Sequence, residues 1–108
     1  MNLNYYFEKL HNGTTSVKIT QQDKAALAKV TVPRIRERLG ELKNLLREKG
    51  TKLNGHESAI AQVGQYLTEL EAFYDAVEKG KKKTLKVDTA RKYINFVRDE
   101  MNALEKLV

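Results

Sequence analysis

The amino-acid sequence predicts an all-α protein, a small antiparallel helical bundle of three long helical segments with shorter helices at the N-terminus. Three observations support this fold class. Apolar residues recur every three or four positions, as they do on the buried face of a helix. The 108 residues include one proline. The stretch with strand-like composition, residues 14–19, has no partner strand. A chain of this length suits one core, so we expect residues 1–108 to form a single domain.

Residues 1–19 are expected to form a short N-terminal helix followed by a linker. Four apolar side chains share one face of this helix: Leu3, Tyr6, Phe7 and Leu10. Gly13 follows at the place where a glycine often ends a helix. The linker would then begin at Thr14.

Residues 20–50 are expected to form a basic helical region, interrupted by Pro33. Its apolar stripe is regular and ends near Gly50: Ala28, Val32, Ile35, Leu39, Leu42 and Leu46. Proline lacks the N–H that an interior helical turn needs, and it disfavours helical angles at the preceding Val32. The unbroken stripe favours one kinked helix, whereas the proline favours two. Of these alternatives we prefer two helices, 21–30 and 33–49.

Two long helices are predicted in the second half of the chain. The acidic helix, residues 56–79, carries an apolar stripe at Ile60, Val63, Leu67, Leu70, Tyr74 and Val77. Gly80 ends it and opens a Lys-rich loop over residues 80–86. The C-terminal helix, residues 88–108, has Asp88 as its expected N-cap. Its stripe is Ala90, Ile94, Val97, Met101, Leu104 and Val108.

The charge is positive overall and unevenly distributed. Lys and Arg number 20 against 14 Asp and Glu, a net charge of +6. Residues 20–50 carry +4, residues 56–79 carry −4, and residues 80–86 carry +4. There is no cysteine, no apolar run long enough for a membrane span, and no signal-peptide pattern at the N-terminus. We therefore expect a cytoplasmic protein without a membrane span.

The sequence offers no catalytic or metal-binding pattern, so we expect neither an enzyme nor a cofactor. His56-Glu57 begins like a zinc-protease motif, but Ile60 stands where the second histidine would be. Four carboxylates crowd the end of the acidic helix: Glu69, Glu71, Asp75 and Glu78. They are interpreted as a solvated face or as partners in ion pairs between helices.

Three consecutive aromatic residues, Tyr5, Tyr6 and Phe7, are the candidate partner-binding site. Successive residues on a helix are 100° apart, so the three cannot all face one core. A core stripe accommodates Tyr6 and Phe7 and leaves Tyr5 turned away, where an aromatic residue is typical of an interface. The alternative is that Tyr5 covers a helix end with its hydroxyl bonded to backbone. The later aromatics, in contrast, are expected in the core: Tyr66, Phe73, Tyr93 and Phe96.

A nucleic-acid site is the alternative. Its candidate residues are three cations on one face of the basic region, Arg36, Lys43 and Arg47, and three in the Lys-rich loop, Lys81, Lys82 and Lys83. The competing explanation is that the first three pair with the acidic helix. Arg38 is placed on another face, beside Glu41.

These observations favour a non-enzymatic module that binds another protein and regulates or inhibits it. Nucleic-acid binding is the second hypothesis, and the sequence does not specify an oligomeric state. In size and charge the chain is similar to immunity proteins and to phage or plasmid accessory proteins. This likeness rests on no motif, so it assigns no residues.

Overall fold

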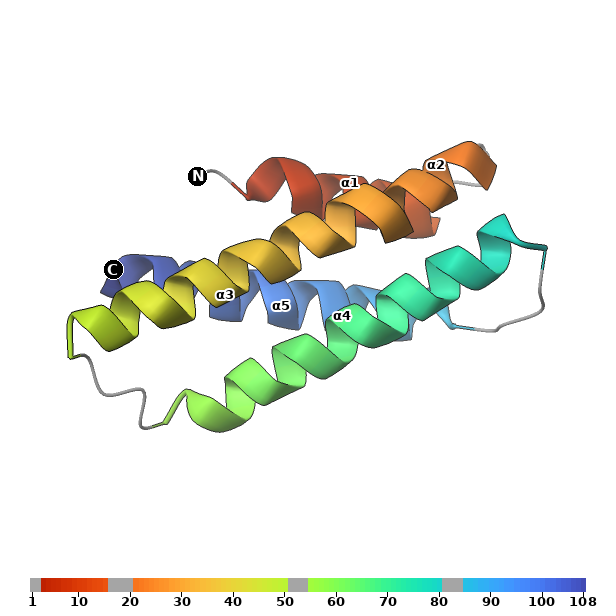
Figure 1. Ribbon diagram of the computed structural model, residues 1–108. Helices are drawn as coiled ribbons and strands as arrows, with labels where there is room; N and C mark the ends of the chain where they lie inside the picture. Colours follow the sequence, from red (N-terminus) through yellow and green to blue (C-terminus); the bar gives the residue numbers. More distant parts are fainter. Residues whose placement is uncertain (1–2, 16–20, 51–54, 81–84) are drawn as a thin grey trace.

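A computed structural model describes residues 3–15, 21–50, 55–80 and 85–108. Within these ranges 89% of the residues are helical and none forms a strand. The helical segments run alternately up and down the long axis of the molecule, so that the start of α1 and the end of α5 lie at the same end of the bundle (Figure 1). The principal extents are 45 × 23 × 18 Å. The predicted all-α antiparallel bundle is confirmed.

The helical segments, in chain order, are α1 (Asn4–Thr15), then α2 (Gln21–Ala26) continuing through η1 (Leu27–Thr31) into α3 (Val32–Glu48), then α4 (Glu57–Glu78) and α5 (Val87–Leu107). Helix α5 packs against both α1 and α4, while α4 also packs against α2 and η1. Helix α1 packs against η1, and Figure 1 draws α1 behind the long helix that begins with α2. Each segment therefore has a neighbour on two sides, and the apolar stripes meet in the middle.

The core is built from the predicted stripes. Leu67 and Leu70 in the middle of α4 are fully buried, as is Ile94 in α5. Helix α1 contributes Phe7 and Leu10, together with Leu3 just before it, and α3 contributes the stripe from Val32 to Leu46. Three residues of the predicted stripes are exceptions. Tyr6 and Val77 are only half-buried, and Val108, which follows the last residue of α5, is 40% exposed. Burying these stripes against one another supplies the main stabilising term of the fold.

The preferred pair of helices around Pro33 is wrong, because the chain is one continuous helix from residue 21 to 48. The segment before the proline, η1, is a π-helix, in which the N–H of Val32 donates to the carbonyl of Leu27, five residues earlier. In an α-helix the proline ring would clash with the carbonyl four residues before it. The wider π-turn relieves this clash and leaves Pro33 in the first turn of α3, where its missing N–H is tolerated. Val32 keeps helical angles, φ −63° and ψ −46°.

Helix α1 is longer than expected, which corrects the predicted cap and linker. It continues through Gly13 and Thr14 and ends at Thr15. Gly13 is buried within the helix, where a Cβ would overlap Cδ1 of Leu27 and lie 3.4 Å from its Cγ. Its role is therefore to let α1 and η1 approach closely, and the rest of the predicted linker lies outside the described residues.

The predicted cap at Gly80 is confirmed, and α3 ends in the same way at Gly50, near which the stripe of the basic region was expected to end. Gly50 and Gly80 adopt left-handed angles, φ 70° and 72°, directly after α3 and α4. Their N–H groups donate to the carbonyls of Arg47 and Val77, at 3.0 and 3.1 Å. Asp88, in contrast, lies within the first turn of α5, and Lys86 is the N-cap. The carboxylate there still interacts favourably with the positive end of the helix dipole.

Candidate functional site

The three aromatic residues predicted to bind a partner point in different directions from α1. Phe7 is 2% exposed and belongs to the core, so it offers no surface to a partner. Tyr6 is half-buried against the core, whereas Tyr5 is 57% exposed. This is the division that the 100° step of the helix predicts. The candidate site therefore reduces to Tyr5 with the outer edge of Tyr6.

The Tyr5 ring is held by its neighbours on α1. It meets the Tyr6 ring edge-on, with centroids 5.5 Å apart, and the Lys9 ammonium lies 4.5 Å from its centroid. Both contacts are favourable, by quadrupole interaction and by cation–π attraction respectively. The Tyr5 hydroxyl makes no hydrogen bond to any residue in the described ranges, so the alternative of a backbone-bonded cover finds no support there.

The row of cations proposed for nucleic acid is only partly available. Arg36 donates to Glu71 of α4 at 2.9 Å, which is the pairing with the acidic helix that competes with phosphate binding. Lys43 and Arg47 have no carboxylate partner among the described residues. The other three candidates, Lys81, Lys82 and Lys83, lie outside the described residues.

Arg38 makes an interhelical contact that the sequence did not reveal. Its guanidinium donates to Glu105 of α5 through Nε and Nη2, at 2.6 and 3.0 Å, and through Nη1 to Glu41 at 2.8 Å. The sequence placed Glu41 beside Arg38, but Glu105 is 67 residues away along the chain. These hydrogen bonds raise the pKa of Arg38 and lower that of Glu105.

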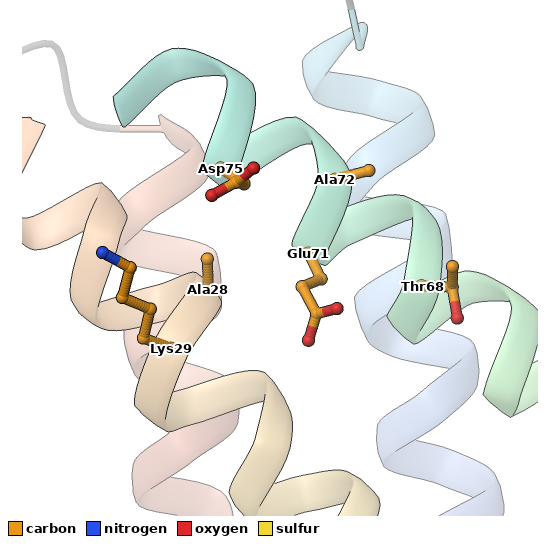
Figure 2. Close-up of a pocket in the computed structure, with 6 residues that line it drawn as sticks. All are labelled: Ala28, Lys29, Thr68, Glu71, Ala72 and Asp75. Atoms are coloured by element: carbon orange, nitrogen blue, oxygen red, sulfur yellow. The ribbon is translucent and has the colours of Figure 1, made fainter. Parts of the chain in front are cut away.

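A cavity of about 450 Å³ lies between η1 and α4. Its lining is Ala28, Lys29, Thr68, Glu71, Ala72 and Asp75. Figure 2 shows Glu71 projecting from α4 toward the helix that carries Ala28 and Lys29. Within the described ranges, no cluster of three or more His, Asp or Glu is placed to hold a metal ion.

Three carboxylates at this end of α4 each lie within 4.0 Å of a cation. Glu71 accepts from Arg36, and Asp75 lies 3.1 Å from the Lys79 ammonium. Glu78 lies 4.0 Å from the Lys29 ammonium across the helix interface. The acidic end of α4 thus forms ion pairs with other helices through Glu71 and Glu78. This was one of the two interpretations of these carboxylates, the other being a solvated face.

An aromatic cluster joins α4 and α5, and its outer member, Phe96, is exposed. The rings of Tyr66 and Tyr93 are stacked, with centroids 4.1 Å apart and an interplanar angle of 14°. Phe96 meets Tyr66 edge-on at 5.4 Å and 86°. Tyr66, Tyr93 and Phe73 are half-buried, but Phe96 is 37% exposed, so its assignment to the core is wrong. One signal was present in the sequence: Phe96 lies about 100° around the helix from Val97 in the buried stripe.

Polar contacts tie the histidines and Tyr74 into the bundle. His56, the N-cap of α4, lies with Nδ1 2.8 Å from Glu100 of α5, and His11 lies with Nε2 3.1 Å from Asn95. Burial is the main cause that lowers the pKa of His11. The Tyr74 hydroxyl is 2.8 Å from that of Thr14, and burial raises the pKa of Tyr74 to about 12. Both histidines and Tyr74 therefore link helices.

The chain matches no protein-family model, no curated protein and no solved structure to a significant degree. None of the helices in the described ranges is long and apolar enough to cross a bilayer.

Proposed function

We propose that the chain is a non-enzymatic protein-binding module that docks on a macromolecular partner and regulates or inhibits it. The observation that carries this proposal is the exposure of Tyr5, a large aromatic side chain that is 57% exposed on the solvent-facing side of α1. Burying a tyrosine of this kind against a partner is a frequent source of binding energy.

The local structure around Tyr5 supports this role. Leu3, Phe7 and Leu10 are buried and anchor α1 to the bundle. The contacts of Tyr5 with Tyr6 and Lys9 restrict its ring before any partner arrives. A preordered side chain loses less conformational entropy on binding, so more of its burial energy is available as affinity.

Nucleic-acid binding is the second candidate, and the unpaired state of Lys43 and Arg47 within the described ranges favours it. The ion pair between Arg36 and Glu71 weighs against it, since Arg36 would have to exchange a carboxylate for a phosphate. We therefore rank this function below protein binding.

A photo-crosslinking amino acid placed at position 5 tests the first proposal. The matched control position is Leu45 on α3, which is 37% exposed. In an extract of the organism that encodes the chain, we expect a discrete protein adduct from position 5 and none from position 45. With that protein purified, Tyr5→Ala should weaken binding by more than about 1 kcal/mol, while the melting midpoint stays unchanged.

Two outcomes would contradict this proposal. A lower melting midpoint for Tyr5→Ala with unchanged affinity would make Tyr5 a structural cover. Retardation of a random DNA or RNA duplex in low salt, lost when Lys43 and Arg47 are both changed to Glu, would instead support nucleic-acid binding.

A further inference from the structure

A second stripe of residues runs along α5, on the side near α4 and outside the core. Its members are spaced by three and four positions: Thr89, Lys92, Phe96, Asp99, Ala103 and Leu107. We call these six residues the outer stripe of α5. Phe96 is 37% exposed and Leu107 is 39% exposed. Its exposed apolar side chains are Phe96 and Leu107, whereas Thr89 and Ala103 are half-buried. Within the described ranges no further helix covers the exposed part of this face.

The centre of the outer stripe is rigid and aromatic. The Phe96 ring rests edge-on against Tyr66, which is itself stacked on Tyr93. Such a supported ring is already ordered, so a partner helix that covers it need not fix its rotamer. Aromatic residues are enriched at protein–protein interfaces, and Phe96 is the exposed ring of this cluster.

The charges of the outer stripe lie on either side of Phe96 with opposite signs. Lys92 precedes Phe96 by about one helical turn, and Asp99 follows it by about one turn. Both side chains are exposed, and the only described ion pair of Asp99 is with its neighbour Arg98. An exposed pair of that kind contributes little stability, so Asp99 remains able to bind another cation.

This arrangement is complementary to a second copy of itself in one orientation. If two α5 helices pack antiparallel across a two-fold axis at Phe96, each Lys92 comes beside Asp99 of the other copy. In a parallel arrangement each Lys92 would face Lys92, and each Asp99 would face Asp99. Two-fold contacts use the same patch on both subunits, and closed dimers of this kind are the commonest oligomers.

We infer that the outer stripe of α5 binds a second copy of this chain, forming an antiparallel two-fold dimer centred on Phe96. The small side chains Thr89 and Ala103 allow the two helices to approach closely on either side of the aromatic centre. Because Tyr5 lies on α1, outside the outer stripe, this inference and the proposed function can fail independently.

Sedimentation equilibrium of the full chain tests the dimer. Between about 10 μM and about 1 mM, the range of a modest homodimer, the apparent mass is expected to rise from 12.4 kDa toward twice that value. Phe96→Ala should weaken association at least about tenfold. Leu45→Ala, which removes a similarly exposed apolar side chain from α3, is the matched control and should leave association unchanged.

Charge exchange provides a second test with variants that do not disturb packing. Lys92→Glu and Asp99→Lys should each weaken association, because each places like charges opposite one another. The double variant, with both changes in one chain, should restore it, because the pairs are re-formed with reversed sign. A monomer at every concentration, equal weakening by Leu45→Ala, or a double variant no stronger than the single ones would each overturn the inference.

Discussion

Arg38 of α3 binds Glu105 of α5 through two parallel hydrogen bonds, Nε to Oε1 at 2.6 Å and Nη2 to Oε2 at 3.0 Å. The Arg38 side chain is 14% exposed and that of Glu105 is 26% exposed, so the pair is partly shielded from water. The paired geometry holds two helices in one relative position, which a single point contact would do less well. This pair is thus a specific link between the middle and the end of the chain.

Replacing Arg38 should destabilise the fold. Arg38→Ala is expected to lower the free energy of unfolding by about 1–2 kcal/mol, between the values for an exposed ion pair and for a buried charged hydrogen bond. Arg34→Ala is the control, since Arg34 is 52% exposed and lies 4.0 Å from Glu37. It should cost less than about 0.5 kcal/mol in urea unfolding. Equal costs for the two variants would show that the Glu105 pair adds nothing.

The same pair predicts a pH dependence in acid. Hydrogen bonding to Arg38 lowers the pKa of Glu105 from its ordinary value of 4.5. A carboxylate with a lowered folded-state pKa stabilises the protein above 4.5, and this contribution is lost as the pH falls from there through the folded-state value. Glu105→Gln should therefore be less stable than the wild type at neutral pH, with the difference shrinking below pH 4.5. A difference that is constant over this range would contradict the prediction.

Gly13 and Gly40 should respond in opposite ways to alanine. A Cβ at Gly13 overlaps Leu27, so Gly13→Ala is expected to cost about 1–3 kcal/mol by overpacking. Gly40 lies within α3 with no atom within 4 Å of the added Cβ. Gly40→Ala should therefore stabilise the protein by about 0.4–1 kcal/mol, because alanine is the better helix former. Thermal melts of both variants measure the contrast, and stabilisation by Gly13→Ala would contradict the close approach of α1 and η1.

Truncation in the middle of α4 should leave cavities. Leu67 and Leu70 are fully buried, so Leu67→Ala and Leu70→Ala are each expected to cost about 2–5 kcal/mol. Leu45→Ala, at a position 37% exposed, should cost much less. Chemical denaturation of the three variants gives the comparison. Costs within about 0.5 kcal/mol of the wild type at both buried positions would refute the assigned core face.

Tyr74 predicts a loss of stability in alkali. Burial raises the pKa of Tyr74 from 10.0 to about 12, so the unfolded chain releases its proton first. The stability that the protonated Tyr74 hydroxyl contributes is fully present below pH 10.0 and is lost as the pH rises through about 12. Tyr74→Phe removes this titration and the hydrogen bond to Thr14, at a cost of about 0.5–1.5 kcal/mol at neutral pH. The variant should lose less stability than the wild type over the alkaline range, and parallel losses would contradict the assignment.

The sequence by itself determined the elements that depend on local periodicity. The apolar stripes around Leu42, Leu67 and Ile94 predicted three long amphipathic segments and the side of each that is buried. Gly50 and Gly80 marked helix ends because a left-handed residue is needed there. The exposure of Tyr5 beside the buried Phe7 also followed from the helical step alone. These features repeat over a few residues, so neighbours in sequence suffice to specify them.

The tertiary structure alone decided the features that depend on residues distant in the chain. Packing of α1 and α4 against η1 accompanies the π-turn before Pro33, a feature that local propensity disfavours. The local sequence predicts that Gly13 ends a helix. In the folded bundle, however, Gly13 lies inside α1, where the Leu27 side chain packs against it. The charge pattern offered pairing of Arg36 with the acidic helix as one explanation, but only the packed bundle identifies Glu71 as its partner and Glu105 of α5 as the partner of Arg38. The periodicity of one helix does not specify which carboxylate of another helix comes within reach. The exposure of Phe96 on α5 likewise depends on how many helices pack around α5, and that number is a property of the assembled bundle.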